Sequence, residues 1–162
     1  MFNPRRARFL RGGKTQPLRP PGAPAEADFV ERCTRCGICL DRCPQNILVH
    51  GRGGFPEVDF SQGECTFCGA CAAHCPSGAL RHWNHPPEAW SAKAIVGPTC
   101  LTRQGIVCYS CQDCCDMNAI SFSPGAVKQP AVDPERCTGC GACVRACPVD
   151  AITVRYLSEA PA

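Results

Sequence analysis

Cysteine is the residue type of this chain with the most chemistry to offer, with 17 thiols among 162 residues. Thiolates are soft metal ligands, and gaps of two residues bring successive sulfur atoms onto one small object. The odd total rules out complete pairing in disulfides. Three groups share the spacing C-x2-C-x2-C-x3-C-P: Cys33, Cys36, Cys39 and Cys43; Cys65, Cys68, Cys71 and Cys75; and Cys137, Cys140, Cys143 and Cys147.

A fourth, irregular group is located by the residues that follow it. The last cysteine of each regular group precedes P-Q-N-I-L, P-S-G-A-L or P-V-D-A-I, and Cys115 precedes the similar run D-M-N-A-I. Counting back by the regular intervals makes Cys111 the third member and Cys108 the second, while the first position falls on Gly105. We therefore expect Cys100 to reach in from a longer loop.

Cys114 is the thiol left over when four groups of four are assigned. It occupies the slot filled by Arg42, His74 and Ala146 in the regular groups, so this slot has no common ligand role. Two interpretations stay open for Cys114, a buried small side chain and a spare thiol.

The regular spacing is the ligand run of bacterial ferredoxins that bind [4Fe-4S] clusters. Structural zinc sites usually pair two cysteine knuckles across a longer gap, which leaves the third cysteine and the C-x3-C-P run unexplained. In two-cluster ferredoxins the fourth cysteine of one run ligates the other cluster. We therefore expect four [4Fe-4S] clusters on crossed sets, each named below by its first cysteine: Cys33, Cys36, Cys39 with Cys75; Cys65, Cys68, Cys71 with Cys43; Cys137, Cys140, Cys143 with Cys115; and Cys100, Cys108, Cys111 with Cys147.

The groups repeat at whole-module intervals. Cys33 to Cys65 is 32 residues, and so is Gly105 to Cys137. The pattern predicts an α+β fold of two tandem bacterial-ferredoxin-like modules, with short strands and one- to two-turn helices around the clusters. The predicted parts are a basic, Pro/Gly-rich flexible arm at 1–27, modules at 28–90 and 91–157, and a short tail at 158–162.

Short elements should position the thiols. We expect helices between the third and fourth cysteines, ending before the following proline, and a stiff extended linker at 82–90, with Trp83 and Trp90 covering the module contact. With so few aliphatic residues the clusters must serve as the core, so the apoprotein should be largely unfolded. Strands are predicted at 47–49, 55–60, 79–83, 94–96, 119–122, 131–133 and 152–154.

The predicted arm is basic, while the rest of the chain is net acidic. Its run R-R-A-R-F-L-R at 5–11 is close to a twin-arginine export signature, but the apolar segment that an export signal needs does not follow. Three interpretations stay open: an export signal, a docking arm for an anionic surface or partner, and an ordinary solvated arm. We expect the protein to stay in the cytoplasm. The arm's basic residues are Arg5, Arg6, Arg8, Arg11, Lys14 and Arg19.

Several function classes find no support. No stretch is apolar enough to span a membrane, and we expect no enzyme, because no phosphate loop, dinucleotide turn or catalytic triad is recognisable. Four oxidised clusters would shift the net charge from +3 to about −5, which disfavours nucleic-acid binding. His74 lies inside a cluster loop and could couple a proton to reduction, but it is also an ordinary surface residue; His50, His82 and His85 have weaker claims.

Nearly the whole chain resembles the NapF family, the ferredoxin-type accessory proteins encoded with periplasmic nitrate reductases. The resemblance rests on the arginine run at 5–12, the segment C-T-R-C at 33–36, the irregular group at 100–115 and the close run C-T-G-C-G-A-C at 137–143. It implies a cytoplasmic iron–sulfur protein that contacts the catalytic subunit, NapA, and assists its maturation before export, by electron or cluster transfer. Asp116 replaces the usual proline, so a labile or three-iron cluster stays open at the Cys100 set.

Two other functions stay open beside this one. The protein could be an electron-transfer subunit of a standing redox complex, or a free polyferredoxin without a fixed partner. A permanent subunit should co-purify with a catalytic subunit, whereas a maturation factor should bind the unexported precursor and be absent from the finished enzyme.

Overall fold

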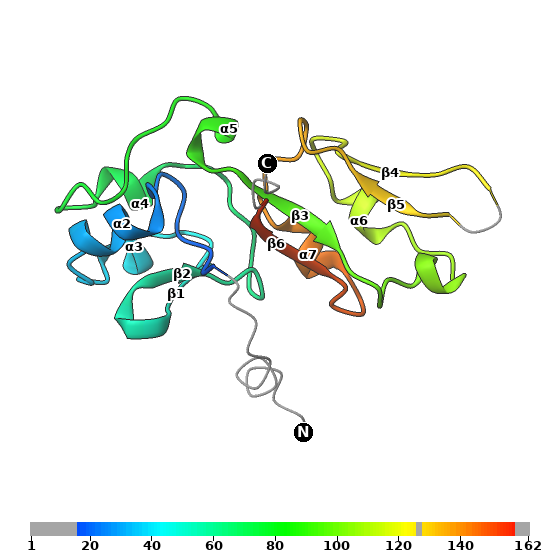
Figure 1. The fold of residues 1–162 in the computed structure, drawn as a ribbon, viewed down its shortest axis with the longest axis horizontal. Helices are drawn as coiled ribbons and strands as arrows, with labels where there is room; N and C mark the ends of the chain where they lie inside the picture. The colour runs from blue at the N-terminus through cyan, green and yellow to red at the C-terminus, as the bar shows by residue number, and fades with distance from the viewer. Residues whose placement is uncertain (1–15, 126–127, 158–162) are drawn as a thin grey trace, which may run out of the picture.

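The computed structural model describes residues 16–125 and 128–157. These residues form short elements joined by long loops (Figure 1). The helices are α2 (Glu26–Arg32), α3 (Ile38–Asp41), α4 (Ala70–Ala73), α5 (Pro86–Ala89), α6 (Ser110–Asp113) and α7 (Ala142–Ala146), with 3-10 turns at Arg52–Gly54 and Thr102–Gln104. The strands are β1 (Leu48–His50), β2 (Pro56–Val58), β3 (Ala92–Val96), β4 (Ile120–Phe122), β5 (Pro130–Val132) and β6 (Ile152–Tyr156).

The strands pair in three antiparallel ribbons among the described residues: β1 with β2, β3 with β6, and β4 with β5. In the β3–β6 ribbon Ala92 faces Tyr156 and Val96 faces Ile152, so the first strand of the second half pairs with its last. Figure 1 shows α2, α3, α4, β1 and β2 at one end of the molecule and α6, β4 and β5 at the other, with β3, β6 and α7 between them. This is an α+β arrangement, as predicted.

The predicted strand at 79–83 is absent from the described residues. Residues 79–83 instead lie beside the segment 18–22, and the Arg81 N–H donates to the Gly22 carbonyl. That segment contains Pro20 and Pro21, which have no N–H to donate to a strand ladder. Gly22 directs its own N–H to the Ala89 carbonyl instead, so a single ladder bond remains and no strand forms.

The prediction of an extended linker at 82–90 was wrong for the second half of that segment. Residues Pro86–Ala89 form the short helix α5, with proline at its first positions, where proline's fixed φ and missing N–H are compatible with a helix. Trp90, at its end, is buried and meets both halves of the molecule. Trp83 packs instead within the first half, against a cluster that contains Phe29 and Leu80.

The predicted arm is packed where the structure describes it, so the prediction of flexibility was wrong for residues 16–27. Arg19 is 4% exposed, and its guanidinium donates to the Glu26 carboxylate at 2.5 and 2.9 Å and to the Pro56 carbonyl at 3.1 Å. The same guanidinium stands 5.3 Å from the Phe29 ring centre, and Phe29 anchors the unpredicted helix α2. The arginine run at 5–11 and the tail at 158–162 lie outside the described residues.

Within the part of the chain that the structure describes, the hydrophobic core is divided into three small clusters, and cysteines belong to or pack against each of them. One cluster gathers Ile47, Leu48, Phe60, Trp90 and Ala92 with four half-buried thiols. Because the apolar groups gather around the cysteines, the core and the candidate site are the same part of the molecule. No helix among the described residues is long and apolar enough to cross a membrane.

Candidate metal centres

The three regular cysteine loops share one backbone design. A glycine in the left-handed region follows the second cysteine and begins a helix of four or five residues that carries the third cysteine: Gly37 before α3 (φ 79°), Gly69 before α4 (φ 74°) and Gly141 before α7 (φ 88°). Glycine adopts this conformation without the penalty that a Cβ imposes. In the irregular loop Tyr109 takes this position with φ −127°, so that loop approaches its helix differently.

The turn after the fourth cysteine is common to all four groups. The third residue beyond that cysteine has positive φ each time: Asn46 (52°), Gly78 (65°), Asn118 (47°) and Asp150 (49°). Its N–H donates to the carbonyl of the fourth cysteine, at 2.8 Å for Asn118 to Cys115. The irregular group therefore shares this backbone turn with the others, at the position that the sequence assigned to Cys115.

One pocket brings together the four thiols of the Cys33 set. Cys33, Cys36, Cys39 and Cys75 line it together with the Thr34–Gly37 loop and the buried residues Phe29, Ala79 and Leu80. Cys36 is exposed, whereas the other three are partly buried. Three of the thiols come from one loop and the fourth from the second group, which is the grouping that crossed ligation would require.

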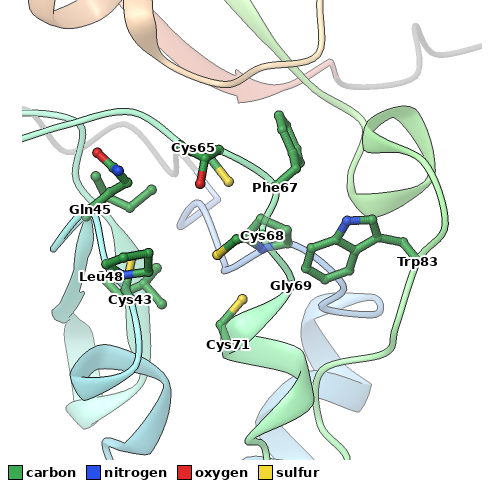
Figure 2. Close-up of a pocket in the computed structure, with 13 residues that line it drawn as sticks. Cys43, Gln45, Leu48, Cys65, Phe67, Cys68, Gly69, Cys71 and Trp83 are labelled. Atoms are coloured by element: carbon green, nitrogen blue, oxygen red, sulfur yellow. The ribbon is translucent and has the colours of Figure 1, made fainter.

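A second pocket brings together the four thiols of the Cys65 set. Cys43, Cys65, Cys68 and Cys71 line it, and Figure 2 shows Cys43 facing the other three across the space between them. Apolar side chains, among them Ile47, Leu48, Phe67 and Trp83, complete the wall. The lining is nearly free of charge, so a bound group would be held by sulfur atoms in a low-dielectric environment.

The second half packs its thiols more deeply. Cys111, Cys137 and Cys143 are buried in one hydrophobic cluster, against which Cys114, Cys115 and Cys147 pack. Backbone amides donate to three of these sulfur atoms: Ala94 N–H to Cys137 Sγ at 3.5 Å, Ala119 N–H to Cys115 Sγ at 3.3 Å, and Ala151 N–H to Cys147 Sγ at 3.2 Å. Cys115 and Cys147 thus each accept an N–H from the residue four positions further along the chain, so their sulfur atoms have equivalent backbone environments.

Hydroxyl groups accompany two thiols of the irregular group. Cys100 Sγ lies 3.0 Å from the Thr102 hydroxyl, and Cys108 Sγ lies 3.6 Å from the Ser110 hydroxyl. Burial acts to raise the pKa of Cys100, but hydrogen bonds from Thr102 and from the Arg103 amide outweigh it and lower the pKa below its ordinary value. Cys75 has a lowered pKa in the same way, through Ser77 and nearby amides.

The more enclosed thiols have the opposite pKa shift. Burial, reinforced by the neighbouring thiols, raises the pKa of Cys39 to about 12, and burial does the same for Cys65 and Cys71. The pKa of Cys111 rises to about 11 for the same reason. Several thiols in one dry space repel one another as thiolates, so a positively charged group bound among them would relieve a real electrostatic cost.

Three other residues singled out from the sequence, Cys114, His74 and His50, have modest environments. Cys114 is half-buried, and its thiol donates to the Cys111 carbonyl at 3.5 Å. The His74 ring is exposed, with Nδ1 2.9 Å from the Ala70 carbonyl, so it caps α4 rather than facing a pocket. His50 lies near Gly37, with its ring 3.7 Å from where a Cβ would stand.

The thiol arrangement fits one kind of metal group. Among residues 16–125 and 128–157, no three Cys, His, Asp or Glu side chains converge as the ligands of one metal ion. The thiols instead surround spaces, four to a pocket in the first half. Four soft thiols around a space larger than one ion fit a polynuclear iron–sulfur cluster.

Sequence reasoning did not find the contacts that join the two halves. Cys65 N–H donates to the Cys140 carbonyl at 2.8 Å, and Trp90 Nε1 donates to the Thr138 carbonyl at 2.7 Å. Both acceptors are backbone atoms, which leave no signal in the sequence. The position of Trp90 at the join, which the sequence did indicate, was the available sign.

Two family profiles match the chain in the regions just described. The 4Fe-4S dicluster domain matches residues 32–79, which contain the two pockets' cysteines. The 4Fe-4S binding domain matches residues 130–153, which contain the last regular group. Iron–sulfur binding domains are thus recognisable in both halves of the chain.

Curated relatives match the chain along most of its length. The chain is 51% identical over 144 residues to "Ferredoxin-type protein NapF" of Haemophilus influenzae, covering 88% of this chain and 81% of that protein. It is 43% identical to the protein of the same name in Escherichia coli K12, covering 86% and 85%. It is also 35% identical over 158 residues to "Methylamine utilization ferredoxin-type protein MauM" of Methylobacillus flagellatus, covering 86% and 68%.

Proposed function

Because this chain belongs to the NapF family of ferredoxin-type proteins, we propose that it is a cytoplasmic four-cluster electron carrier. Its role is to contact NapA, the catalytic subunit of periplasmic nitrate reductase, and to assist the maturation of NapA before export, by electron or cluster transfer. It acts without being an enzyme itself. The observation that carries the proposal is the gathering of four thiols from two cysteine groups around each pocket of the first half.

Each cluster has a proposed set of ligands. The first two sets follow the pocket linings, and the last two follow the repeat and the shared core of the second half. The sets are Cys33, Cys36, Cys39 and Cys75; Cys65, Cys68, Cys71 and Cys43; Cys137, Cys140, Cys143 and Cys115; and Cys100, Cys108, Cys111 and Cys147. A [4Fe-4S] cluster supplies one-electron redox chemistry whose potential depends on hydrogen bonds to sulfur and on solvent exposure.

The residues of the chain tune these sites in different ways. Hydroxyl and amide donors at Cys75 and Cys100 stabilise negative charge on sulfur. The Cys65 set is enclosed by apolar side chains, which disfavour added negative charge. We therefore propose that the four sites differ in potential, so that one electron does not distribute evenly among them.

The proposed modules follow the same division of the chain. The first comprises residues 28–90 and the second residues 91–157, and the packed segment 16–27 belongs with the first module, because Arg19 joins it to Glu26 and Pro56. The arginine run at 5–11 is the candidate element for docking NapA. The chain also resembles MauM, at lower identity. We therefore propose that more distant relatives of this chain serve redox systems other than nitrate reductase.

Cluster content is tested by anaerobic iron and sulfide analysis with electron paramagnetic resonance (EPR). About sixteen irons per chain are expected from four [4Fe-4S] clusters. About twelve would leave the irregular site empty and reduce the proposal to three clusters. A folded, colourless and iron-free protein prepared without oxygen would contradict it.

The proposed partner is tested by binding to purified NapA precursor. The full chain should bind the precursor and not the mature, cluster-loaded enzyme, and a variant with Arg5, Arg6, Arg8 and Arg11 changed to alanine should bind it more weakly with an unchanged visible spectrum. A stoichiometric complex with the mature enzyme would favour the alternative of a standing electron-transfer subunit. Absence of binding to either form would favour a free polyferredoxin.

A further inference from the structure

We propose that the four cysteine sets lie in one row in the order Cys33, Cys65, Cys137, Cys100, which differs from their order along the chain. The seam around Cys65 and Cys140 holds the two inner sets together. The proposal rests on the proposed function for the presence of four clusters. It concerns how this chain places the thiols that hold them.

The first link in the row joins the two sets of the first half. Cys39, from the Cys33 set, and Cys71, from the Cys65 set, pack against the same two hydrophobic clusters. The two pockets therefore lie on either side of one shared wall.

The second link is the seam between the halves. The Cys65 N–H donates to the Cys140 carbonyl at 2.8 Å, so a proposed ligand of one set is hydrogen-bonded directly to a proposed ligand of the other. No third residue intervenes along this connection. The bond makes the Cys65 and Cys137 sets neighbours, although 72 residues separate the first cysteines of the two groups.

Trp90 braces the seam from both sides. Its Nε1 donates to the carbonyl of Thr138, which lies between Cys137 and Cys140. Its ring meets the Phe67 ring edge-on with centroids 6.0 Å apart, and Phe67 lies between Cys65 and Cys68. The side chain is 6% exposed. Trp90 thus touches both inner cysteine loops and is a positioning residue for them.

Phe60 closes the seam beside Trp90. A Cβ at Gly141 would lie 2.2 Å from the Phe60 ring, so the ring of the first half lies directly on the backbone that follows Cys140. The Phe60 and Trp90 rings meet edge-on at 6.3 Å. Because Phe60 contacts both Trp90 and the backbone at Gly141, these contacts fix the distance between the two inner cysteine loops.

The third link joins the two sets of the second half. Cys111, from the Cys100 set, is buried in one cluster with Cys137 and Cys143. Figure 1 shows α7, which carries Cys143, between the helices of the first half and α6, which carries Cys111. The Cys100 set is therefore at the far end of the row.

Strand β3 explains why the order in space departs from the order in the chain. Its first residues hold the Cys137 loop, because Lys93 Nζ donates to the Cys137 carbonyl at 2.6 Å and a Cβ at Gly139 would strike the Ala92 carbonyl. Its last residue, Val96, leads away from the join toward Cys100. The strand thus places the later group, which begins at Cys137, next to the join between the halves. It places the earlier group, which begins at Cys100, at the far end of the molecule.

Two double variants of the full chain test the order. Cys36→Ala with Cys108→Ala leaves the Cys65 and Cys137 sets, whereas Cys36→Ala with Cys140→Ala leaves the Cys65 and Cys100 sets. Each should hold about eight irons. After full reduction, the first variant should give an EPR spectrum broadened by spin–spin interaction, and the second should give the sum of two separate signals, because magnetic interaction falls steeply with separation.

The opposite pattern would overturn the proposed order, as would equal broadening in the two variants. A third measurement covers the case in which a double variant fails to assemble. In the loaded full chain with all cysteines present, Trp90→Ala should accelerate amide hydrogen exchange in the 64–68 segment and reduce the spin–spin broadening, with iron content unchanged. Unchanged exchange and unchanged broadening would refute the positioning role of Trp90.

The two levels of the proposal fail in different ways. An unmodified protein with far fewer than sixteen irons contradicts the four-cluster function, whatever the order. An unmodified protein with about sixteen irons, combined with variants that interact in the wrong pairs, contradicts only the row.

Discussion

At the residue scale, the buried charge of Arg19 shows how a segment that looks flexible becomes fixed. Its guanidinium makes a two-pronged pair with Glu26, donates to the Pro56 carbonyl and lies between the Phe29 and Phe55 rings, 5.3 and 5.4 Å from their centres. Burial acts to lower the pKa of Arg19, but Glu26 outweighs it and raises the pKa, so the group stays charged. One side chain thereby joins the 16–22 segment to α2 and to the β1–β2 ribbon.

Replacing Arg19 by alanine should destabilise the loaded protein by about 2 kcal/mol. Breaking a buried pair costs several kcal/mol because the partner is left uncompensated, but the cost is smaller here because the Glu26 side chain is 33% exposed and water can solvate it. The measurement is the half-life of the cluster absorbance at a fixed elevated temperature. Arg32→Ala, in the exposed last turn of α2, is the matched control and should change the half-life little.

Cys114 and Cys115 are adjacent thiols for which the structure suggests opposite roles. Cys115 Sγ accepts a backbone N–H from Ala119, as Cys147 does from Ala151, whereas the Cys114 thiol donates to a backbone carbonyl. Cys115→Ala should lower the iron content by up to about four atoms per chain, and Cys114→Ala should leave it unchanged. Iron loss confined to Cys114→Ala would exchange the two assignments.

At the element scale, each regular cysteine loop depends on a glycine that begins a very short helix. Helices of four or five residues are too short to be stable alone, so their positions depend on these caps and on the thiols they carry. The left-handed conformation at Gly37, Gly69 and Gly141 lets the loop turn sharply between the second and third cysteines. The short helices α3, α4 and α7 therefore serve to position the sulfur atoms of the cysteines that they carry.

Gly69→Ala and Gly141→Ala should differ in cost although their backbones match. Each places alanine in the left-handed region, which costs about 1–2 kcal/mol. At Gly69 the new methyl group meets nothing within 4 Å, whereas at Gly141 it would meet the Phe60 ring at 2.2 Å, which adds about 1–3 kcal/mol of overpacking. Cluster absorbance followed over time on heating should therefore decay faster in Gly141→Ala, and equal decay would contradict the tight contact at the seam.

At the scale of the whole molecule, the chain has little to hold it together besides its thiols. Its ribbons have strands of three to five residues and its longest described helix has seven. Each hydrophobic cluster is completed by cysteines. Isolated two-stranded ribbons and single helical turns are marginal in water, so a bound metal group must contribute a large part of the folding free energy.

Removing iron should therefore unfold most of the chain. Under reducing, anaerobic conditions, a chelator that bleaches the visible absorbance should also abolish most amide hydrogen-exchange protection, because the cysteine loops lose the group that joins them and voids remain between them. Protection should return on reconstitution with iron and sulfide. An iron-free chain that keeps its protected amides in β3 and β6 would show that the protein core is sufficient by itself.

The sequence alone was enough to predict the chemistry of the candidate sites and the fold class. Cysteine spacing is a local property, so the four groups, the expected helices between third and fourth cysteines and the role of Trp90 at the join could be inferred without a structure. Composition alone gave a wrong prediction for residues 16–27, because their prolines and glycines suggested a free arm. The burial of Arg19 depends on Glu26, Phe29 and Pro56, which only the fold brings together.

The arrangement of the sites in space was decided by tertiary structure. The hydrogen bond between the Cys65 N–H and the Cys140 carbonyl joins two backbone groups. Because nearly every residue carries the same backbone groups, no pattern of side chains in the sequence predicts this bond. The pairing of β3 with β6 is likewise non-local, and it carries the Cys137 group past the Cys100 group to the join. Spacing determines which thiols can share a cluster, whereas the pairing of distant strands determines which clusters are neighbours.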